Sequence, residues 1–320
     1  MGDVNGVGPE ILAKALAHAE VREKCSLLVV GSHHAYENAR VLAPGAPRAI
    51  RATVPAPETS PDEPIPVFDA GTGDPPLHPG TLDVEASRCA VEWIRTATRL
   101  AMDGAVDAIV TCPINKEGIQ LAGCASMGHT EIIAEMTHAP DYWMCLFTDR
   151  MRIVHISAHW PLSEAIAMVR QHRIEASIRI AHATLGRMGL ARRRIAVAGL
   201  NPHAGEAGLL GPEEEREIAP AVKACRAEGI DCSGPYPPDT VFRRMYDGEF
   251  ELVVAMYHDQ GHIPLKLIAM DEGVNVTLGI PIVRTSVDHG TAYDIAGKGI
   301  AREHSLCSAI RLAVALAETR

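Results

Sequence analysis

Short apolar runs rich in β-branched residues alternate along the chain with longer segments in which apolar residues recur every three or four positions. The short runs predict buried strands, and the longer segments predict amphipathic helices. Because the two kinds of segment alternate, we expect an α/β fold with a largely parallel sheet covered by helices. The predicted strands are residues 26–31, 107–112, 142–148, 152–157, 194–199, 251–256 and 275–278, and the predicted helices are residues 9–19, 84–102, 173–188, 213–228 and 305–318.

One long segment, residues 54–79, does not follow this alternation. It is rich in proline, which removes backbone donors and fixes the backbone angle φ. We expect it to form a long irregular excursion on the surface rather than a linker between domains.

Composition and charge limit the class of protein. Apolar residues make up 47% of the 320 residues and charged residues 22%, the balance of a globular chain with a sizeable core. This length suits two domains or one large α/β unit. The formal net charge is −10 and no run of Lys and Arg occurs. Nucleic acid is therefore not the expected partner, although a local basic pocket could still bind a small anion.

The sequence also indicates the compartment in which the chain works. No apolar stretch approaches the roughly 20 residues of a membrane span, and the N-terminal residues lack the basic-then-apolar pattern of a signal peptide. The eight cysteines include no CxxC pair, and several lie in apolar runs. We therefore expect free thiols in a reducing cytoplasm and no membrane partner.

Polar side chains follow four of the predicted strands. Ligands of open parallel sheets bind beyond the carboxyl ends of the strands, so we expect these side chains to meet at one edge. Three of the four are histidines. The residues are Lys116 after strand 107–112, His159 after 152–157, His203 after 194–199 and His258 after 251–256.

The three histidines predict one catalytic divalent metal ion. Neutral imidazoles are favoured ligands of zinc and other transition metals, and three protein ligands with an open fourth position are typical of catalytic sites. With 15 histidines in the chain, each one alone is also explained as a loop or core residue hydrogen-bonded to the backbone. The shared position of His159, His203 and His258 after strands favours the common metal site.

Three familiar enzyme signatures are missing from the sequence. Gly2, Gly6 and Gly8 have the wrong spacing for a dinucleotide-binding fingerprint, and no strand precedes them. The chain also lacks a Walker A phosphate loop and the Gly-x-Ser-x-Gly elbow of serine hydrolases.

Several longer blocks resemble the 4-hydroxythreonine-4-phosphate dehydrogenase (PdxA) family. They occur in the family's order over nearly the whole chain, and together they are highly specific. The blocks are residues 2–10, 113–116, 128–131, 201–206 (NPHAGE), 238–240, 256–266 (MYHDQGHIPLK), 273–281 and 284–292 (RTSVDHGTA).

The resemblance implies a fold and an assembly. Residues 289–301 are also similar to the cofactor loop of isopropylmalate and isocitrate dehydrogenases, whose fold has two α/β domains with largely parallel sheets and the active site in the cleft between them. Residues 1–138 plus 264–320 would form the cofactor-side domain, and residues 139–263 the domain with the metal ligands and dimer contacts. A homodimer is implied, with the active site at the subunit interface and metal ligands from both subunits.

The resemblance also assigns roles to individual residues. It places a zinc, magnesium, manganese or cobalt ion on His159, His203 and His258. The residues implied to bind the substrate are His129, Thr130, Lys266, Asn275 and Arg284. The residues implied to bind NAD, or NADP as the alternative, are His289, Gly290, Thr291, Ala292 and Asp294. Asp239 matches an active-site acid of the family, and for both Asp239 and Lys116 a catalytic role and the ordering of neighbouring loops stay open.

The implied reaction is the metal-dependent, NAD-linked oxidation of a small phosphorylated hydroxy acid, followed by loss of CO₂. Residues 205–211 and the block Gln260-Gly261-His262 are more similar to the branch that acts on 4-phospho-D-threonate and 4-phospho-D-erythronate, giving dihydroxyacetone phosphate by oxidation at C3. In the vitamin B6 branch, which acts on 4-hydroxythreonine 4-phosphate in pyridoxal phosphate synthesis, leucine is expected in place of this histidine. That branch is the alternative. A third branch, of aromatic cis-dihydrodiol dehydrogenases, lacks the phosphate-binding residues that this chain retains.

Two other classes of protein would explain only some of these sequence features. A metal-dependent hydrolase would need the three histidines but would leave Lys266, Arg284 and residues 290–301 without a role. A metal-binding or regulatory protein that is not an enzyme would need the cofactor loop but no hydride transfer. We therefore expect a dehydrogenase.

Overall fold

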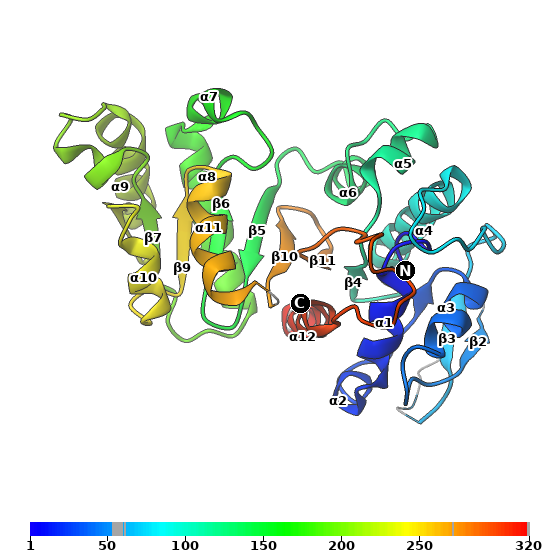
Figure 1. Ribbon diagram of the computed structural model, residues 1–320. Coiled ribbons are helices and arrows are strands. Elements are labelled where there is room, and N and C mark those ends of the chain that lie inside the picture. The colour runs from blue at the N-terminus through cyan, green and yellow to red at the C-terminus, as the bar shows by residue number, and fades with distance from the viewer. Residues whose placement is uncertain (53–59, 61, 271, 319–320) are drawn as a thin grey trace. The chain divides into compact units, whose positions relative to one another are not determined.

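The structure is a computed structural model that describes residues 1–52, 60, 62–270 and 272–318. It divides into two compact parts, which we call unit 1 (Met1–Pro140 with Ile280–Ala317) and unit 2 (Asp141–Gly279). The chain builds unit 2 from one continuous segment and returns to unit 1 for its last strand and helix. Figure 1 labels most of the helices and strands of both units.

The boundaries of the units differ from the expected domains at residues 264–279. The sequence places these residues in the cofactor-side domain, whereas the structure places them in unit 2. Helix α11 (His258–Ala269) runs across this boundary without a break, although Pro264 lies inside it. Strand β10 (Val274–Leu278) pairs antiparallel with β5 (Trp143–Phe147). Helix continuity and backbone pairing thus hold the segment in unit 2.

Unit 1 contains a small parallel sheet and a further pair of parallel strands. The sheet has the order β1 (Val29–Val30), β3 (Ile65–Phe68), β2 (Ala49–Arg51), and the pair is β4 (Ala108–Thr111) with β11 (Val283–Val287). The helices are α1 (Gly8–Ala17), α2 (Ala19–Arg22), α3 (His33–Arg40), α4 (Val84–Met102), α5 (Lys116–Leu121), α6 (His129–Met136) and α12 (His304–Ala317). Helix α12 packs on β4 and β11, and α1 packs on α3 and α12 (Figure 1).

Helix α4 shows how the local sequence specifies this unit. Asp83 caps the helix, because its carboxylate accepts a hydrogen bond from the backbone N–H of Ala86 at 2.8 Å. Apolar residues at helical spacing then bury one face, with Trp93 only 2% exposed. The predicted bounds of 84–102 are confirmed.

Part of the proline-rich segment is a strand, contrary to the sequence prediction. Residues 65–68 form β3, the central strand of the small sheet, and Ile65 and Val67 belong to the core of unit 1. Pro66 interrupts the apolar alternation, which explains why the strand was not expected. Residues 53–59 and 61 of this segment lie outside the described residues.

Unit 2 is a layer of six strands with helices packed on it. The strand order is β10, β5, β6 (Arg152–His155), β9 (Leu252–Ala255), β7 (Ile195–Ala198), β8 (Cys232–Tyr236). The last four are mutually parallel, whereas β5 is antiparallel to both of its neighbours. Helix α11 lies against β6 and β9, and α8 lies against β6, β7 and β9 (Figure 1). The helical segments besides α11 are α7 (Leu162–Ala165), η1 (Ile166–Met168), α8 (Gln171–Arg187), η2 (Pro202–Glu206), η3 (Glu214–Ile218), α9 (Ala219–Ala227) and α10 (Val241–Tyr246).

The expected α/β fold with mostly parallel strands is confirmed in this arrangement. All eight cysteines are free, and all but Cys25 are buried. Among the helices of the described residues, none combines the length and the apolar composition that a membrane crossing requires.

Candidate active site

The three strands that precede the predicted metal ligands are neighbours in unit 2. Strands β6, β9 and β7 lie side by side and parallel. The chain segments that leave their carboxyl ends, and with them His159, His258 and His203, therefore emerge at one edge of the layer. Lys116 follows β4, which belongs to unit 1 instead.

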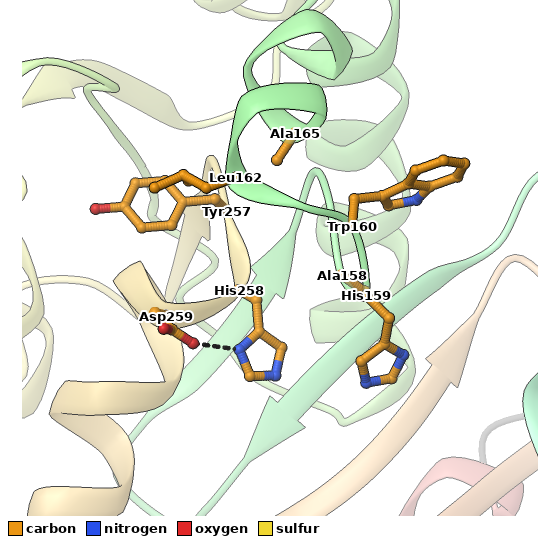
Figure 2. Close-up of a pocket in the computed structure, with 8 residues that line it drawn as sticks. All are labelled: Ala158, His159, Trp160, Leu162, Ala165, Tyr257, His258 and Asp259. Carbon is orange, nitrogen blue, oxygen red and sulfur yellow. Dashed lines mark hydrogen bonds and ion pairs between the residues drawn. The ribbon is translucent and has the colours of Figure 1, made fainter. Parts of the chain in front are cut away.

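His159 and His258 share a pocket of unit 2. Their ring centroids are 5.8 Å apart, and Figure 2 shows the two imidazoles side by side below the turn of α7. The Nδ1 atom of His258 is 2.6 Å from a carboxylate oxygen of Asp259 and donates to it. This bond leaves Nε2 of His258 as the ring nitrogen that could bind a metal, an arrangement typical of metal-binding histidines. The pocket is lined by Ala158, His159, Trp160, Leu162, Ala165, Tyr257, His258 and Asp259.

Two further histidines lie behind His258. The ring of His262 stacks on that of His258, with centroids 3.7 Å apart and planes 11° apart. His155 follows, with its ring centroid 4.7 Å from that of His262. Burial lowers the pKa of His155 to about 3 and that of His262 to about 4, so both rings are neutral at pH 7.

His203 is exposed on a strained loop that starts at the end of β7. Its φ of 53° lies in the left-handed region, as does the φ of 56° of Ala204. The buried carboxylate of Glu214 holds the start of the loop by accepting hydrogen bonds from the backbone N–H groups of Leu200 and Asn201 at 2.8 and 2.7 Å. The position of His203 is therefore set by contacts of the loop backbone.

The structure thus brings together two of the three predicted metal ligands. Within the part of the chain that the structure describes, no three His, Cys, Asp or Glu side chains are grouped so that they could hold a metal ion. The site with His159, His203 and His258 therefore stays a prediction. The chemistry of the His159–His258 pair does fit a transition metal, because both are imidazoles in a pocket and one is oriented by a carboxylate.

Three other predicted residues lie in unit 2. Lys266 is on α11, at the helical spacing that aligns it with His258 and His262 along one face of the helix. Asn275 is on β10, and its Oδ1 atom is buried without a hydrogen-bond partner among the described residues. Asp239 is exposed between β8 and α10, beyond the carboxyl end of a strand parallel to β7.

In unit 1, Arg284 and His129 form a buried basic site. Arg284 is 3% exposed on β11 and donates to the hydroxyl of Thr111 on β4 at 2.9 Å. Burial lowers its pKa to about 10, so the guanidinium stays charged at pH 7. The pKa of His129 is well below its usual value because of burial first and the charge of Arg284 second. Its Nε2 atom is buried without a hydrogen-bond partner among the described residues. A buried cation beside an unsatisfied polar atom is suited to an anionic ligand.

The backbone adds to this positive site. His129 and Thr130 are the first two residues of α6, where unpaired N–H groups and the helix dipole favour an anion. Lys116 is the first residue of α5, which Asn115 caps by accepting from the N–H of Gly118 at 2.8 Å. A Cβ on Gly128 would lie 3.8 Å from Cε of Lys116, so this lysine reaches the beginning of α6.

The predicted cofactor loop follows β11 and packs on the N-terminal segment of unit 1. The backbone N–H of Val7 donates to the carbonyl of Thr291 at 2.9 Å, and the hydroxyl of Tyr293 donates to the carboxylate of Asp3. A Cβ on Gly6 would lie 2.9 Å from the backbone of Thr291, which explains the glycine. His289, Gly290 and Asp294 are exposed, whereas Thr291 and Ala292 are half-buried. The loop thus has a braced backbone and exposed polar side chains.

Four residues that shape these sites were not expected from the sequence. His155 and Glu214 are buried beneath the histidine-bearing segments, Asp259 orients His258, and Tyr293 braces the cofactor loop. His155 ends an apolar strand, which is an unusual place for a polar side chain and is the one signal that could have revealed it.

The chain is similar to known proteins over nearly its whole length. The family model described as pyridoxal phosphate biosynthetic protein PdxA matches residues 23–313. D-threonate 4-phosphate dehydrogenase of Cupriavidus necator is 46% identical, with 100% of this chain and 96% of that protein covered. 4-hydroxythreonine-4-phosphate dehydrogenase of Desulfosudis oleivorans is also 46% identical, with 98% and 94% covered. The solved structure of 4-hydroxythreonine-4-phosphate dehydrogenase from Klebsiella pneumoniae has a TM-score of 0.84 and 44% identity, with 99% and 98% covered. The chain therefore belongs to the PdxA family, as its sequence blocks predict.

Proposed function

We propose that this chain is an NAD-linked, divalent-metal-dependent dehydrogenase that oxidises a 4-phosphorylated four-carbon hydroxy acid at C3 and releases CO₂. The proposed substrate is 4-phospho-D-threonate or 4-phospho-D-erythronate, and the product is dihydroxyacetone phosphate. The observation that carries this proposal is the 46% identity over the full chain to a protein named D-threonate 4-phosphate dehydrogenase.

A second candidate is the dehydrogenation of 4-hydroxythreonine 4-phosphate. It is favoured by the equal identity to the relative that has this name. The histidine at position 262 argues for the first candidate, because leucine is expected there in the vitamin B6 branch. NADP in place of NAD stays an alternative for both.

The substrate phosphate would bind in unit 1. Arg284 supplies a buried positive charge and a planar pair of donors, which suits the oxygen atoms of a phosphate. The N–H groups at the start of α6 would donate to the remaining oxygens, with Lys116 close by. Lys266 and Asn275 of unit 2 would bind the other polar groups of the substrate, for which the unsatisfied Oδ1 of Asn275 is available. An aromatic cis-dihydrodiol would leave this basic site without a ligand, so that third candidate is not favoured.

His159, His203 and His258 would hold the metal, which is zinc, magnesium, manganese or cobalt. When bound, the metal would lower the pKa of the C3 hydroxyl of the substrate, and NAD would accept the hydride from C3. Asp259 holds the proton on Nδ1 of His258 and so keeps Nε2 ready for coordination. The cofactor would lie on the loop that contains His289, Gly290, Thr291, Ala292 and Asp294.

Two residues are proposed to move protons. The carboxylate of Asp239 can accept the proton of the C3 hydroxyl, and the ammonium of Lys116 can return one to the carbon that loses CO₂. Both side chains are exposed, so neither is held by a buried structural network. Because both side chains are exposed, each is accessible to a bound substrate.

The enzyme is proposed to act as a cytoplasmic homodimer with the active site at the subunit interface. Helix α11, which carries His258, also exposes the apolar side chains of Ile263 and Leu267, and the next residue after the helix, Met270, continues this exposed apolar stripe. Leu267 is 85% exposed. An apolar stripe of this kind next to a site indicates a contact with another protein surface. We also propose that the chain shares the fold of isopropylmalate and isocitrate dehydrogenases.

The proposal is tested by following NADH absorbance with purified protein loaded in turn with Zn²⁺, Mg²⁺, Mn²⁺ and Co²⁺. The three substrates are 4-phospho-D-threonate, 4-phospho-D-erythronate and 4-phosphohydroxy-L-threonine. His203→Ala should abolish turnover, whereas His172→Ala, a change at an exposed histidine of α8, should not. Turnover of only the amino acid would favour the second candidate. The same assays are repeated with NADP. If metal-loaded protein reduces neither NAD nor NADP with any of the three, the proposed phosphorylated substrates are excluded.

A further inference from the structure

The ring of His262 is held in place by a continuous column of hydrogen bonds. The column begins at the carbonyl oxygen of Met144, which is 3.2 Å from Nδ1 of His155. Nε2 of His155 is in turn 3.2 Å from Nδ1 of His262. The Nδ1 atom of His262 is also 3.1 Å from the carbonyl oxygen of His258. Both rings are buried, with His155 1% and His262 5% exposed.

This column assigns one tautomer to each ring. A carbonyl oxygen can only accept, so Nδ1 of His155 carries the proton and its Nε2 is an acceptor. Nδ1 of His262 faces two acceptors, Nε2 of His155 and the carbonyl of His258, so it too carries the proton. In each ring Nδ1 is thus the donor, and rotation of either ring by 180° would break the hydrogen bonds of the column.

We propose that His262 is a positioning residue for His258 and that His155 acts on His258 only through His262. The inference rests on the proposed function, because it concerns the histidine that would bind the metal. The ring of His262 lies flat against that of His258, while Asp259 holds Nδ1 of His258 from the side. Together these contacts fix the plane and the direction of the His258 ring, and with them the direction of its Nε2 lone pair.

The packing shows that the column is built into the fold and does not merely fill space. Gly261 lies inside α11, where a Cβ would be 2.5 Å from Nε2 of His155. Only glycine lets the helix approach the His155 ring closely enough for the hydrogen bond to His262. A leucine at position 262 could fill the same volume, but it could neither donate to His155 nor present a flat ring to His258.

The test is a double-mutant cycle on metal affinity. Zn²⁺ and Co²⁺ binding is measured by competition with a chelating dye for the wild-type protein, His262→Leu, His155→Leu and the double variant. We expect His262→Leu to lower the affinity by at least about 10-fold, and His155→Leu to lower it in the wild-type background but not in the His262→Leu background. His172→Leu is the control for a His→Leu change elsewhere in unit 2. Affinities within twofold of wild type for both single variants would overturn the inference.

The outcome also separates this inference from the proposed function. If the wild-type protein binds no metal, or if His258→Ala binds it as well as wild type does, the proposed metal site fails. A second measurement does not need the metal or the variants. In metal-free wild-type protein, ¹⁵N NMR of the imidazoles should show His155 and His262 each protonated at Nδ1 alone. Averaging between tautomers at either ring would contradict the column.

Discussion

The carboxylate of Glu214 accepts hydrogen bonds from both the backbone N–H and the side-chain amide of Asn201, at 2.7 and 2.9 Å. The first of its oxygens also accepts from the backbone N–H of Leu200. One buried side chain thus fixes the start of the loop that carries His203. The loop then adopts left-handed backbone at His203 and Ala204, which costs free energy in residues other than glycine. These hydrogen bonds to Glu214 offset that cost.

Replacing Glu214 by alanine should therefore loosen the His203 loop. Two partly buried backbone N–H groups would lose a charged acceptor, so we expect the free energy of unfolding to fall by about 3 kcal/mol. Metal affinity should fall with it, because His203 would no longer be held at the edge of the strands. Urea denaturation and metal titration measure the two effects.

The neighbouring Glu215→Ala is the matched control, since Glu215 is exposed on the same helical segment. It should leave both the unfolding midpoint and the metal affinity near wild type. Equal stability of Glu214→Ala and Glu215→Ala would mean that the loop is held by other contacts.

The periodic parts of this fold were predictable from the sequence, and the irregular parts were not. Strands such as 252–255 and the helix 84–102 have clear apolar periodicity, so their type was evident from their own residues. Helix α11 was not expected, because Gly261 and Pro264 lie inside it. The tertiary contact of Gly261 with His155 compensates for the low helix propensity of glycine.

The same limit applies to the candidate site. The edge that carries the three histidines was predictable, because the position of a residue after a strand can be read from the chain. The contacts of His155 with His262 and of Glu214 with the His203 loop were not, because they join residues that are far apart in sequence. Only the position of His155 at the end of an apolar strand is a local signal for such a buried polar residue, whereas Glu214 stands among other acidic residues in the sequence and has no such signal.

Arg284→Lys should weaken binding of the phosphorylated substrate. Arg284 is buried and hydrogen-bonded to Thr111, and lysine would keep the charge but lose the planar pair of donors. We expect KM to rise by about 10-fold and kcat to change less. A tenfold rise corresponds to a loss of about 1.4 kcal/mol of binding free energy, which is about what one hydrogen bond to a charged group contributes. Initial rates over a range of substrate concentrations measure both parameters.

Arg95→Lys provides the comparison for this change, because Arg95 is an exposed arginine of the same unit that pairs with Glu92. Its kinetics should match those of wild type. An unchanged KM in Arg284→Lys would place the substrate phosphate elsewhere.

The metal-free protein should lose stability in mild acid because of His155 and His262. Their folded pKa values, about 3 and about 4, lie below the ordinary value of 6.5. Between pH 6.5 and 4 the unfolded chain therefore binds protons that the folded chain does not. The stabilisation is fully present above pH 6.5 and is lost as the pH falls, by up to about 1.4 kcal/mol per pH unit for each histidine.

Urea denaturation at a series of pH values, with EDTA present, compares wild type with the His155→Leu/His262→Leu variant. Carboxylates contribute equally to both proteins, so the difference between the two profiles isolates the histidine pair. The profile of the wild type should be steeper between pH 6.5 and 4. Parallel profiles would show that the two rings are protonated in the folded protein as readily as in water.

Gly261→Ala should destabilise the protein although alanine favours helices. In a helix interior, replacing glycine by alanine would by itself raise the free energy of unfolding by about 1 kcal/mol. Here the new Cβ would lie 2.5 Å from Nε2 of His155 and 2.7 Å from Cγ2 of Ile153, and both side chains are buried and cannot move aside. We expect the overlap to outweigh the gain and to lower the free energy of unfolding by about 1–3 kcal/mol.

Gly186→Ala on α8 is a matched test of this reasoning. The three atoms nearest to its Cβ would all belong to the guanidinium of Arg193, an exposed side chain that can swing away, so the helix-propensity gain should remain. The two alanine variants should therefore change the urea midpoint in opposite directions. If Gly261→Ala also raises the midpoint, α11 does not approach His155 as closely as the structure has it, and the hydrogen bond from His262 to His155 loses its support.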